Sequence, residues 1–325
     1  MVRTPILFQT FARADYARQV WDAIKASKPD IIYFYSNKAR SERYEEVKNN
    51  EIIRAFINEI DWECKLHTWF RDEYVDVYTS LKSSVDWICE NEDEWIVLEE
   101  DVIPTHAFFH FCDQMLDYYR YDYRVWNVSG DNFWNLSPQG YDYLFSNYHW
   151  MYGWATWKSR WRAINWDKVR IDEMLEQDIY RHLYKSKSQY LARIEERKSN
   201  KSFIETTKCW DYMFGLACEQ NNAVQVIPAY HLVTNIGISG VHHKKAQISF
   251  VNRSCKYTSS TYEITKRPPF VFADYEYDYL IYKNAEKEYR SWFKRILYVF
   301  VDLLHIRGLL HSVKSTKLYK LFRHR

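Results

Sequence analysis

Trp95-Ile-Val-Leu-Glu-Glu-Asp-Val-Ile-Pro104 is the stretch that decides the fold of this chain. Its first four residues are apolar and are typical of a buried strand. Three carboxylates, Glu99, Glu100 and Asp101, follow directly. Ligands of an open α/β sheet lie beyond the carboxyl ends of its strands, so the stretch predicts an acidic ligand site. The alternative is a strand that ends in a solvated acidic turn.

Three adjacent acids repel one another unless a cation or hydrogen-bond donors compensate their charge. A hard divalent cation with oxygen ligands provides such compensation. Mn²⁺ or Mg²⁺ would bind one carboxylate together with the two phosphates of a nucleotide sugar. The ion would neutralise the charge that develops on a leaving diphosphate. The sequence therefore predicts Mn²⁺ or Mg²⁺ as the cofactor.

Apolar runs alternate with helical patterns on both sides of this stretch. The predicted strands are residues 6–8, 31–35, 65–70, 95–98, 124–128 and 223–227, and the predicted helices are residues 16–25, 41–60, 77–90, 106–119 and 209–220. Strands separated by helices predict parallel pairing in a Rossmann-like sheet. Residues 131–166 are expected to be rich in loops, and residues 172–201 to form a charged helical insertion.

The composition limits the class of protein. Of the 325 residues, 47% are hydrophobic, which is enough for a substantial core and excludes global disorder. Only seven glycines occur, without GxGxxG or GxxxxGK, which disfavours dinucleotide-binding and P-loop enzymes. Aromatic residues make up 18%. Their faces suit the apolar C–H edges of sugar rings, and a Trp- and Tyr-rich core is the alternative.

Cysteine usage and hydropathy indicate a compartment. The six cysteines form no CxxC pair, which disfavours a zinc ribbon and predicts free thiols in a reducing compartment. Residues 1–11 lack the pattern of a signal peptide, and no run of about 18 apolar residues predicts a membrane span. We therefore expect a cytoplasmic protein.

The charge is concentrated at one end of the chain. Residues 290–325 carry nine Lys or Arg and one acid, Asp302, so that the rest of the chain has a charge of −6. This distribution disfavours a nucleic-acid partner. Residues 291–310 have a helical pattern with a broad apolar face, which suits the surface of an anionic membrane. We expect a catalytic domain at 1–285 and a basic amphipathic tail at 286–325, peripheral at the cytoplasmic face of the membrane. A tail docked on the domain is the alternative.

The acidic motif resembles the metal-binding motif of GT-A-fold glycosyltransferases, especially the N-acetylglucosaminyltransferase I family and bacterial hemolysin-like glycosyltransferases. Four further segments follow the order of that family: Ile6-Leu-Phe-Gln-Thr-Phe-Ala-Arg13, Val128-Ser-Gly-Asp-Asn-Phe133, Tyr152-Gly-Trp-Ala-Thr-Trp157, and Trp210-Asp211 with Asn235-Ile-Gly237 and Gly240-Val-His-His243. The resemblance spans about residues 5–245. Glu-Glu-Asp replaces the more usual Glu-Asp-Asp, and residues 167–202 have no counterpart in the family.

The resemblance implies an α/β protein of the GT-A class and assigns residues to the donor. Asp101 matches the acid that contacts the metal. The residues on the nucleotide side are Arg13, Ser36, Asn37, Glu99, Glu100, His242 and His243. Of these, Glu100 and Glu99 match acids that face the ribose and the donor sugar. Ser36 and Asn37 stand where the family places a uracil-contacting acid, so the identity of the base is open.

The resemblance also implies residues on the acceptor side. Asp211 matches the general base, which would take the proton of the acceptor hydroxyl in an inverting transfer. A helix-capping carboxylate is the alternative for Asp211, with Asp131 and Asp142 as other candidates for the base. Trp154 and Trp157 match the acceptor-binding segment, and a place in the core is their alternative.

We therefore expect a metal-dependent glycosyltransferase that moves a sugar from a nucleotide-diphosphate donor to a glycan or lipid-linked glycan. A retaining transferase on the same fold is one alternative. A carbohydrate-binding or assembly protein without turnover is another. A sugar nucleotidyltransferase is disfavoured, because the first strand is not followed by a Gly-rich phosphate loop.

Overall fold

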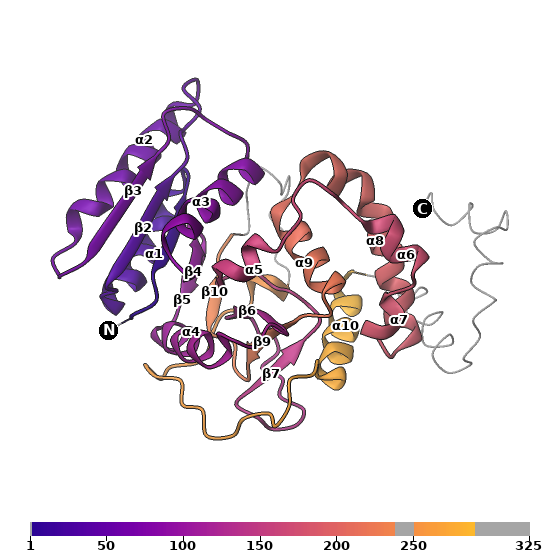
Figure 1. The fold of residues 1–325 in the computed structure, drawn as a ribbon. Coiled ribbons are helices and arrows are strands. Elements are labelled where there is room, and N and C mark those ends of the chain that lie inside the picture. The colour runs from indigo at the N-terminus through magenta and orange to yellow at the C-terminus, as the bar shows by residue number, and fades with distance from the viewer. Residues whose placement is uncertain (1, 238–249, 290–325) are drawn as a thin grey trace.

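The computed structural model describes residues 2–237 and 250–289 as a mixed α/β structure (Figure 1). The strands are β1 (Ile6–Thr10), β2 (Ile31–Ser36), β3 (Lys65–Phe70), β4 (Glu94–Glu99), β5 (Val102–Pro104), β6 (Val125–Ser129), β7 (Tyr143–Ser146), β8 (Trp154–Trp157), β9 (Val224–Pro228) and β10 (Val233–Asn235). The α-helices are α1 (Ala14–Ser27), α2 (Tyr44–Arg54), α3 (Val77–Asn91), α4 (His106–Tyr119), α5 (Lys158–Arg162), α6 (Ile171–Glu176), α7 (Tyr180–Leu183), α8 (Lys187–Thr207), α9 (Trp210–Gln220) and α10 (Tyr275–Tyr289). Two 3₁₀ helices complete this part of the chain, η1 (Ala55–Glu59) and η2 (Phe250–Asn252).

Eight strands form one sheet in the order β3-β2-β1-β4-β8-β6-β9-β7. The strands β3, β2, β1 and β4 are parallel, as are β6 and β9, whereas β8 and β7 run antiparallel to their neighbours. The predicted α/β fold with a large mixed sheet is confirmed. The sequence did not predict β7, β8 or the small antiparallel pair β5–β10, which are only three or four residues long.

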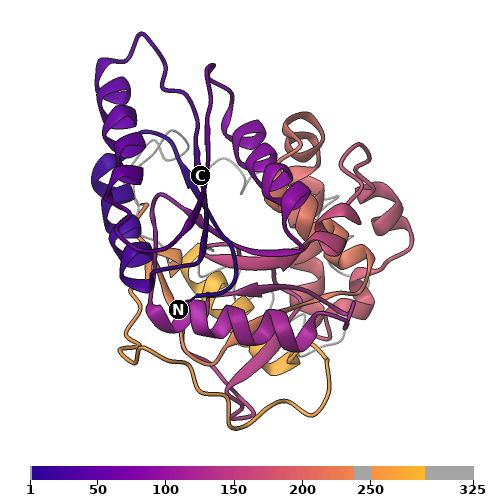
Figure 2. The ribbon, with the colours of Figure 1, turned by 60° about the vertical axis from the view of Figure 1, so that its left-hand side comes forward.

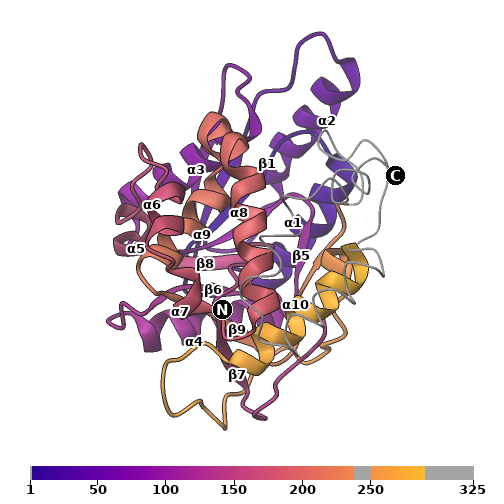
Figure 3. The same ribbon diagram turned by 90° about the vertical axis from the view of Figure 1, so that its right-hand side faces the viewer.

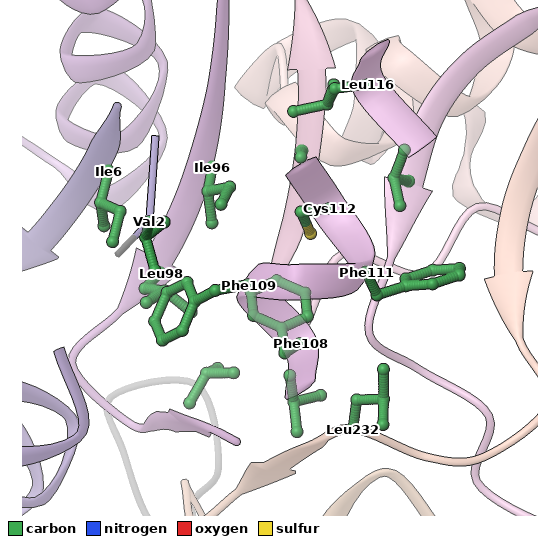
Figure 4. Packing of buried hydrophobic residues seen from close by; sticks show 14 of the residues in the cluster. Val2, Ile6, Ile96, Leu98, Phe108, Phe109, Phe111, Cys112, Leu116 and Leu232 are labelled. Carbon is green, nitrogen blue, oxygen red and sulfur yellow. The ribbon is translucent and has the colours of Figure 1, made fainter. Parts of the chain in front are cut away.

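Helices cover both faces of the sheet (Figure 2). Successive side chains of a strand point to opposite faces. In β1, Ile6 and Phe8 belong to the apolar cluster that includes residues of α1 and α4, whereas Leu7 belongs to the cluster that includes residues of α3 and α9. Figure 4 shows Phe108 and Phe109 of α4 in the first cluster. Burying each such Phe stabilises the fold by about 1.5–3 kcal/mol.

The predicted charged insertion consists of α6, α7 and α8 and lies against α9 (Figure 3). A separate apolar cluster joins these helices: Ile171, Met174, Tyr180, Tyr184, Ile204, Met213 and Leu216. Because Met213 and Leu216 belong to α9, the insertion shares its core with that helix.

All six cysteines are free, as predicted. Of the helices in the described part of the chain, none is long and apolar enough to cross a membrane. The predicted tail, apart from the last turn of α10, and the predicted residues His242 and His243 lie outside the described residues.

Candidate active site

The three acids of the central motif lie at the carboxyl end of β4, next to the turn that follows β1. Arg13 binds two of them: its Nε lies 2.7 Å from Glu100 Oε1, and its Nη1 lies 2.8 Å from Asp101 Oδ2. The parallel pairing of β1 with β4, with Gln9 opposite Glu99, brings Arg13 to this position. The site that the sequence predicts at this edge of the sheet thus contains Arg13 and all three acids.

Glu100 is buried and holds the turn between β1 and α1. Its Oε2 accepts hydrogen bonds from the backbone N–H groups of Phe11 at 2.7 Å and Arg13 at 3.4 Å, and Oε1 accepts from the Arg13 side chain. The side chain is only 4% exposed. These contacts explain why a carboxylate is required here, and they give Glu100 a structural role beside the ribose contact predicted for it.

Asp101 lies against the segment that follows β10. Its backbone carbonyl accepts from the N–H of Ile236 at 2.8 Å. A Cβ atom at Gly237 would lie 2.1 Å from Asp101 Oδ2, so only glycine allows this approach. Asn235 Oδ1 accepts from the N–H of Gly237 at 2.8 Å and fixes the turn. The Asn-Ile-Gly segment predicted from the resemblance is therefore part of the same site.

Asp211 is brought to the acids by a stack of two indoles. Trp210, the first residue of α9, stacks on Trp154 of β8, with ring centroids 5.5 Å apart and planes 19° apart. Trp154 is paired with Val97 of β4. Glu99 lies two residues beyond Val97 and therefore on the same face of the strand. The stack thus places Asp211 beside the acidic end of β4.

The charges of Asp211 and the β4 acids interact. Burial is the main reason that the pKa of Glu99 is raised to about 8. The negative charges of Asp101 and Asp211 raise the pKa of Glu99 further, and Arg13 lowers it. Among the described residues, four acidic side chains therefore share this site with the guanidinium group of Arg13.

The Asp211 side chain is exposed and held in position by its neighbours. It accepts from the backbone N–H of Tyr212 at 2.8 Å and from the thiol of Cys209 at 2.6 Å through the same oxygen, Oδ1. Asp211 lies in the first turn of α9, where the helix dipole stabilises a negative charge by about 0.3–1 kcal/mol. The role of general base that the resemblance implies for Asp211 stays a prediction.

The other two candidates for the base have structural partners. Asp131 is 0% exposed, and its Oδ2 accepts from the N–H of Tyr152 at 3.0 Å. Burial raises its pKa well above the usual value. Asp142 accepts from the backbone N–H groups of Thr265 and Lys266, both at 2.6 Å. Neither carboxylate resembles Asp211 in exposure and position.

The residues at the acidic end of β4 fit a cation held by one protein carboxylate. Within residues 2–237 and 250–289, no three His, Cys, Asp or Glu side chains are arranged to hold a metal. Glu100 is occupied by Arg13 and by backbone donors, and its side chain is 5% exposed. Asp101 also binds Arg13, through Oδ2, but its side chain is 15% exposed. Mg²⁺ in phosphate-transfer sites is commonly held by one or two carboxylates and the phosphates of the ligand. Asp101 fits that arrangement, and a cage made only of protein ligands does not fit.

The side chains of Ser36 and Asn37 are buried, at 0% and 4% exposure. Ser36 Oγ accepts from Asn50 Nδ2 and Arg54 Nε, both at 3.1 Å. Asn37 Nδ2 donates to the carbonyl of Val75 at 2.9 Å. The Ser36 bonds tie the end of β2 to α2, and the Asn37 bond braces the loop that precedes α3. The nucleotide contact that the resemblance implies for the two residues stays a prediction.

An aromatic pair near Ser36 and Asn37 was not predicted. The rings of Phe11 and Tyr74 have centroids 5.9 Å apart, and the Arg40 guanidinium lies 5.8 Å from the first and 5.5 Å from the second. Phe11 lies in the segment 6–13 that resembles a nucleotide-binding turn, so the sequence contained a signal for this ring. Tyr74 comes from a loop without a pattern of its own.

Trp154 and Trp157 belong to the core, at 1% and 2% exposure. Trp154 carries the stack with Trp210, and Trp157 Nε1 donates to the carbonyl of Leu116 at 3.2 Å. Neither indole face is open to a sugar, which does not agree with the acceptor-binding role predicted for them. Both indoles instead lie in the core, which was the alternative for them.

No protein-family model and no curated protein matches the chain. Among solved structures, the chain is similar to a mannosyltransferase from Pyrobaculum calidifontis in complex with GDP-Man and Mn²⁺, with 11% identity over 47% of this chain and 44% of that one and a TM-score of 0.34. It is also similar to an apo UDP-glucose pyrophosphorylase, with 9% identity, 73% and 94% coverage and a TM-score of 0.35. The glycosyltransferase GlyE of Streptococcus pneumoniae has 12% identity, 65% and 43% coverage and a TM-score of 0.30. The chain thus spans less than half of two of these proteins, and TM-scores below 0.5 carry no argument about its activity.

Proposed function

We propose that the protein is a glycosyltransferase that moves a sugar from a nucleotide-diphosphate donor to the hydroxyl of a glycan or lipid-linked glycan. The observation that carries this proposal is the excess of negative charge at the carboxyl end of β4. Arg13 binds Glu100 and Asp101, and the charges of Asp101 and Asp211 act on Glu99, so that among the described residues the acids of this site outnumber its guanidinium group. Such a site favours a further cation, which in turn favours a diphosphate ligand.

Asp211 would act as the general base of an inverting transfer, and its exposed side chain in the first turn of α9 supports this role. In this reaction the acceptor oxygen forms a bond to the anomeric carbon while the bond from that carbon to the diphosphate oxygen breaks. The hydroxyl proton passes to the exposed Asp211 carboxylate, and the electron pair of the breaking bond leaves with the nucleoside diphosphate. The hydrogen bonds from Tyr212 and Cys209 hold the carboxylate in one orientation.

Asp101 and Arg13 would bind the donor. Asp101 would hold Mn²⁺ or Mg²⁺, which supplies charge neutralisation to the leaving diphosphate when it is bound. The Arg13 guanidinium is 34% exposed and already oriented by Glu100. It can therefore bind a phosphate oxygen while Glu100 keeps it in place.

Calorimetry of a nucleoside diphosphate and its sugars, with and without Mn²⁺, tests this proposal. We expect Mn²⁺ to strengthen binding to the wild-type protein about tenfold or more, because one carboxylate and the phosphates share the ion. Asp101→Asn keeps the size of the side chain but removes the charge, so the enhancement by Mn²⁺ is expected to be lost.

Asp22→Asn is the matched control, since Asp22 is a surface carboxylate of α1 whose side chain is 56% exposed. This variant should bind like the wild type. Equal enhancement by Mn²⁺ in Asp101→Asn and wild type would rule out the metal role of Asp101. A wild-type protein that binds simple sugars but no nucleotide would favour the carbohydrate-binding alternative.

A further inference from the structure

Three aromatic rings from separate elements meet beside Asp211. Tyr78 is near the start of α3, Phe203 is in the last turns of α8, and Tyr212 follows Asp211 in α9. The Phe203 ring centroid lies 6.0 Å from that of Tyr78 and 6.3 Å from that of Tyr212. The interplanar angles are 75° and 77°, so both rings meet Phe203 edge to face. We call these three residues the aromatic platform.

The platform is joined to the carboxylate of Asp211 on two sides. Tyr212 donates its backbone N–H to Asp211 Oδ1. The pKa of Tyr78 is raised to about 12, mainly by burial and also by the proximity of Cys209 and Asp211. Cys209 in turn donates its thiol to Asp211 Oδ1 at 2.6 Å. The contacts of the platform therefore lead to Asp211.

The orientation of Phe203 is not explained by the core of the insertion. Its neighbour Ile204 is 0% exposed and packs in the cluster that α8 shares with α9, whereas Phe203 is 41% exposed. The Tyr212 hydroxyl accepts from Asn200 Nδ2 at 3.0 Å, which fixes the second ring of the platform from the same helix. Helix α8 thus presents an exposed ring beside the proposed base.

The chemistry of the platform suits the apolar face of a pyranose. Phe203 offers a ring without a hydrogen-bonding group, and the two tyrosines offer rings with a hydroxyl at the edge. A sugar needs both, because its C–H face is apolar and its hydroxyls need polar partners. A ring seated here would have a hydroxyl near Asp211, the group that would take its proton.

We propose that Tyr78, Phe203 and Tyr212 bind the acceptor sugar and position its hydroxyl at Asp211. The inference rests on the proposed glycosyltransferase function and adds the acceptor site to it. Phe203 lies in α8, one residue beyond the stretch 167–202 that has no counterpart in the family the chain resembles. The inference therefore assigns part of the acceptor specificity to α8.

Kinetics with methyl glycosides of glucose, galactose, mannose and N-acetylglucosamine as acceptors tests the proposal. Phe203→Ala removes the central ring from an exposed position and should leave folding intact. We expect the acceptor KM to rise about 5- to 30-fold, the loss expected for one stacking contact. The donor dissociation constant and the rate of donor hydrolysis by water should not change, because neither involves the acceptor.

Phe270→Ala is the control, since Phe270 is 69% exposed and pairs with Phe272. Phe203→Leu keeps the apolar character without the ring, and we expect it to recover only part of the loss. An unchanged acceptor KM in Phe203→Ala, with donor hydrolysis and transfer intact, would overturn the platform. Weakened donor binding in that variant would also overturn it, since the ring would then stack on the nucleobase. A wild-type protein without donor binding would instead refute the proposed function.

Discussion

Helix α9 carries a carboxylate near each end, and the two carboxylates have opposite electrostatic surroundings. At its start, Asp211 is exposed and faces the acids of β4, with Arg13 as the guanidinium group of that site. Near its end, Glu219 is 5% exposed and binds Arg197, with Oε1 2.7 Å from Nη2 and Oε2 3.2 Å from Nε.

The charges at the end of α9 are balanced, and those at its start are not. Glu219 and Glu196 face Arg197 and Arg193, two acids against two cations, and the Tyr180 hydroxyl adds a donor to Glu219. At the start of the helix, among the described residues, four acids share the guanidinium group of Arg13. A balanced set with the buried pair Arg197–Glu219 at its centre needs no ligand and joins the insertion to α9. An unbalanced, partly exposed set is the kind that ligands complete.

The largest effect that distinguishes the two ends is on turnover. Asp211→Asn keeps the size of the side chain but removes its capacity to accept a proton. We expect turnover to fall roughly 10²- to 10⁴-fold, while the donor dissociation constant changes only modestly. Turnover and donor binding are to be measured on one preparation with an acceptor that the wild type uses.

Asp172→Asn provides a matched control, because Asp172 is also a carboxylate in the first turn of a helix, and its side chain is 63% exposed. It should keep the turnover of the wild type. If Asp211→Asn keeps it as well, Asp211 is only a helix-capping residue. If it instead loses donor binding as strongly as Asp101→Asn, Asp211 positions the donor.

At the other end of α9 the expected effect is on stability. Arg197→Met leaves the Glu219 carboxylate buried without its bidentate partner, and breaking a buried pair in this way destabilises by about 3–5 kcal/mol. The double variant Arg197→Met, Glu219→Leu removes both charges and should recover most of that loss. Urea denaturation of the two variants and the wild type measures the difference. A single variant within about 1 kcal/mol of wild type would show that the pair does not anchor the insertion.

The sequence could predict the features of the two ends of α9 that depend on contiguous residues, but not those that depend on residues distant in the sequence. The acidic end of β4 was predictable because an apolar run and three acids are contiguous, and parallel pairing with β1 then brings Arg13 to them. The pair Arg197–Glu219 joins an insertion to a helix, and neither residue has a local signal of its partner. The sequence could not decide whether Trp154 binds a sugar or lies in the core, because its surroundings too are set by residues distant in the sequence. Its burial depends on β8, a four-residue antiparallel strand whose place is set by β4 and β6.

A third buried carboxylate, Asp278 of α10, tests what happens when the counter-ion is missing. Asp278 is 2% exposed and accepts hydrogen bonds from the Ser146 hydroxyl and from the N–H of Asn147. Glu219 has Arg197 in direct contact, whereas the contacts of Asp278 are these neutral groups. The pKa of Asp278 is raised to about 7, because burial and the charge of Asp274 outweigh the lowering by Ser146, Asn147 and Arg193.

The raised pKa of Asp278 makes stability depend on pH with a definite sign. The carboxyl is protonated in both states at low pH, and the unfolded chain loses its proton at about pH 3.9, before the folded protein does. Stability is therefore lost as the pH rises from about 4 to about 7, by at most about 1.4 kcal/mol per pH unit. Asp278→Asn cannot ionise, so this loss is absent in the variant. The free energy of unfolding of the variant relative to wild type should rise by about 2 kcal/mol between pH 5 and pH 7. Denaturation of both proteins at several pH values measures this difference and cancels the groups they share. Parallel pH profiles of the two proteins would show that Asp278 stays ionised in the folded protein. Burial without a cation in direct contact would then not distinguish Asp278 from Glu219.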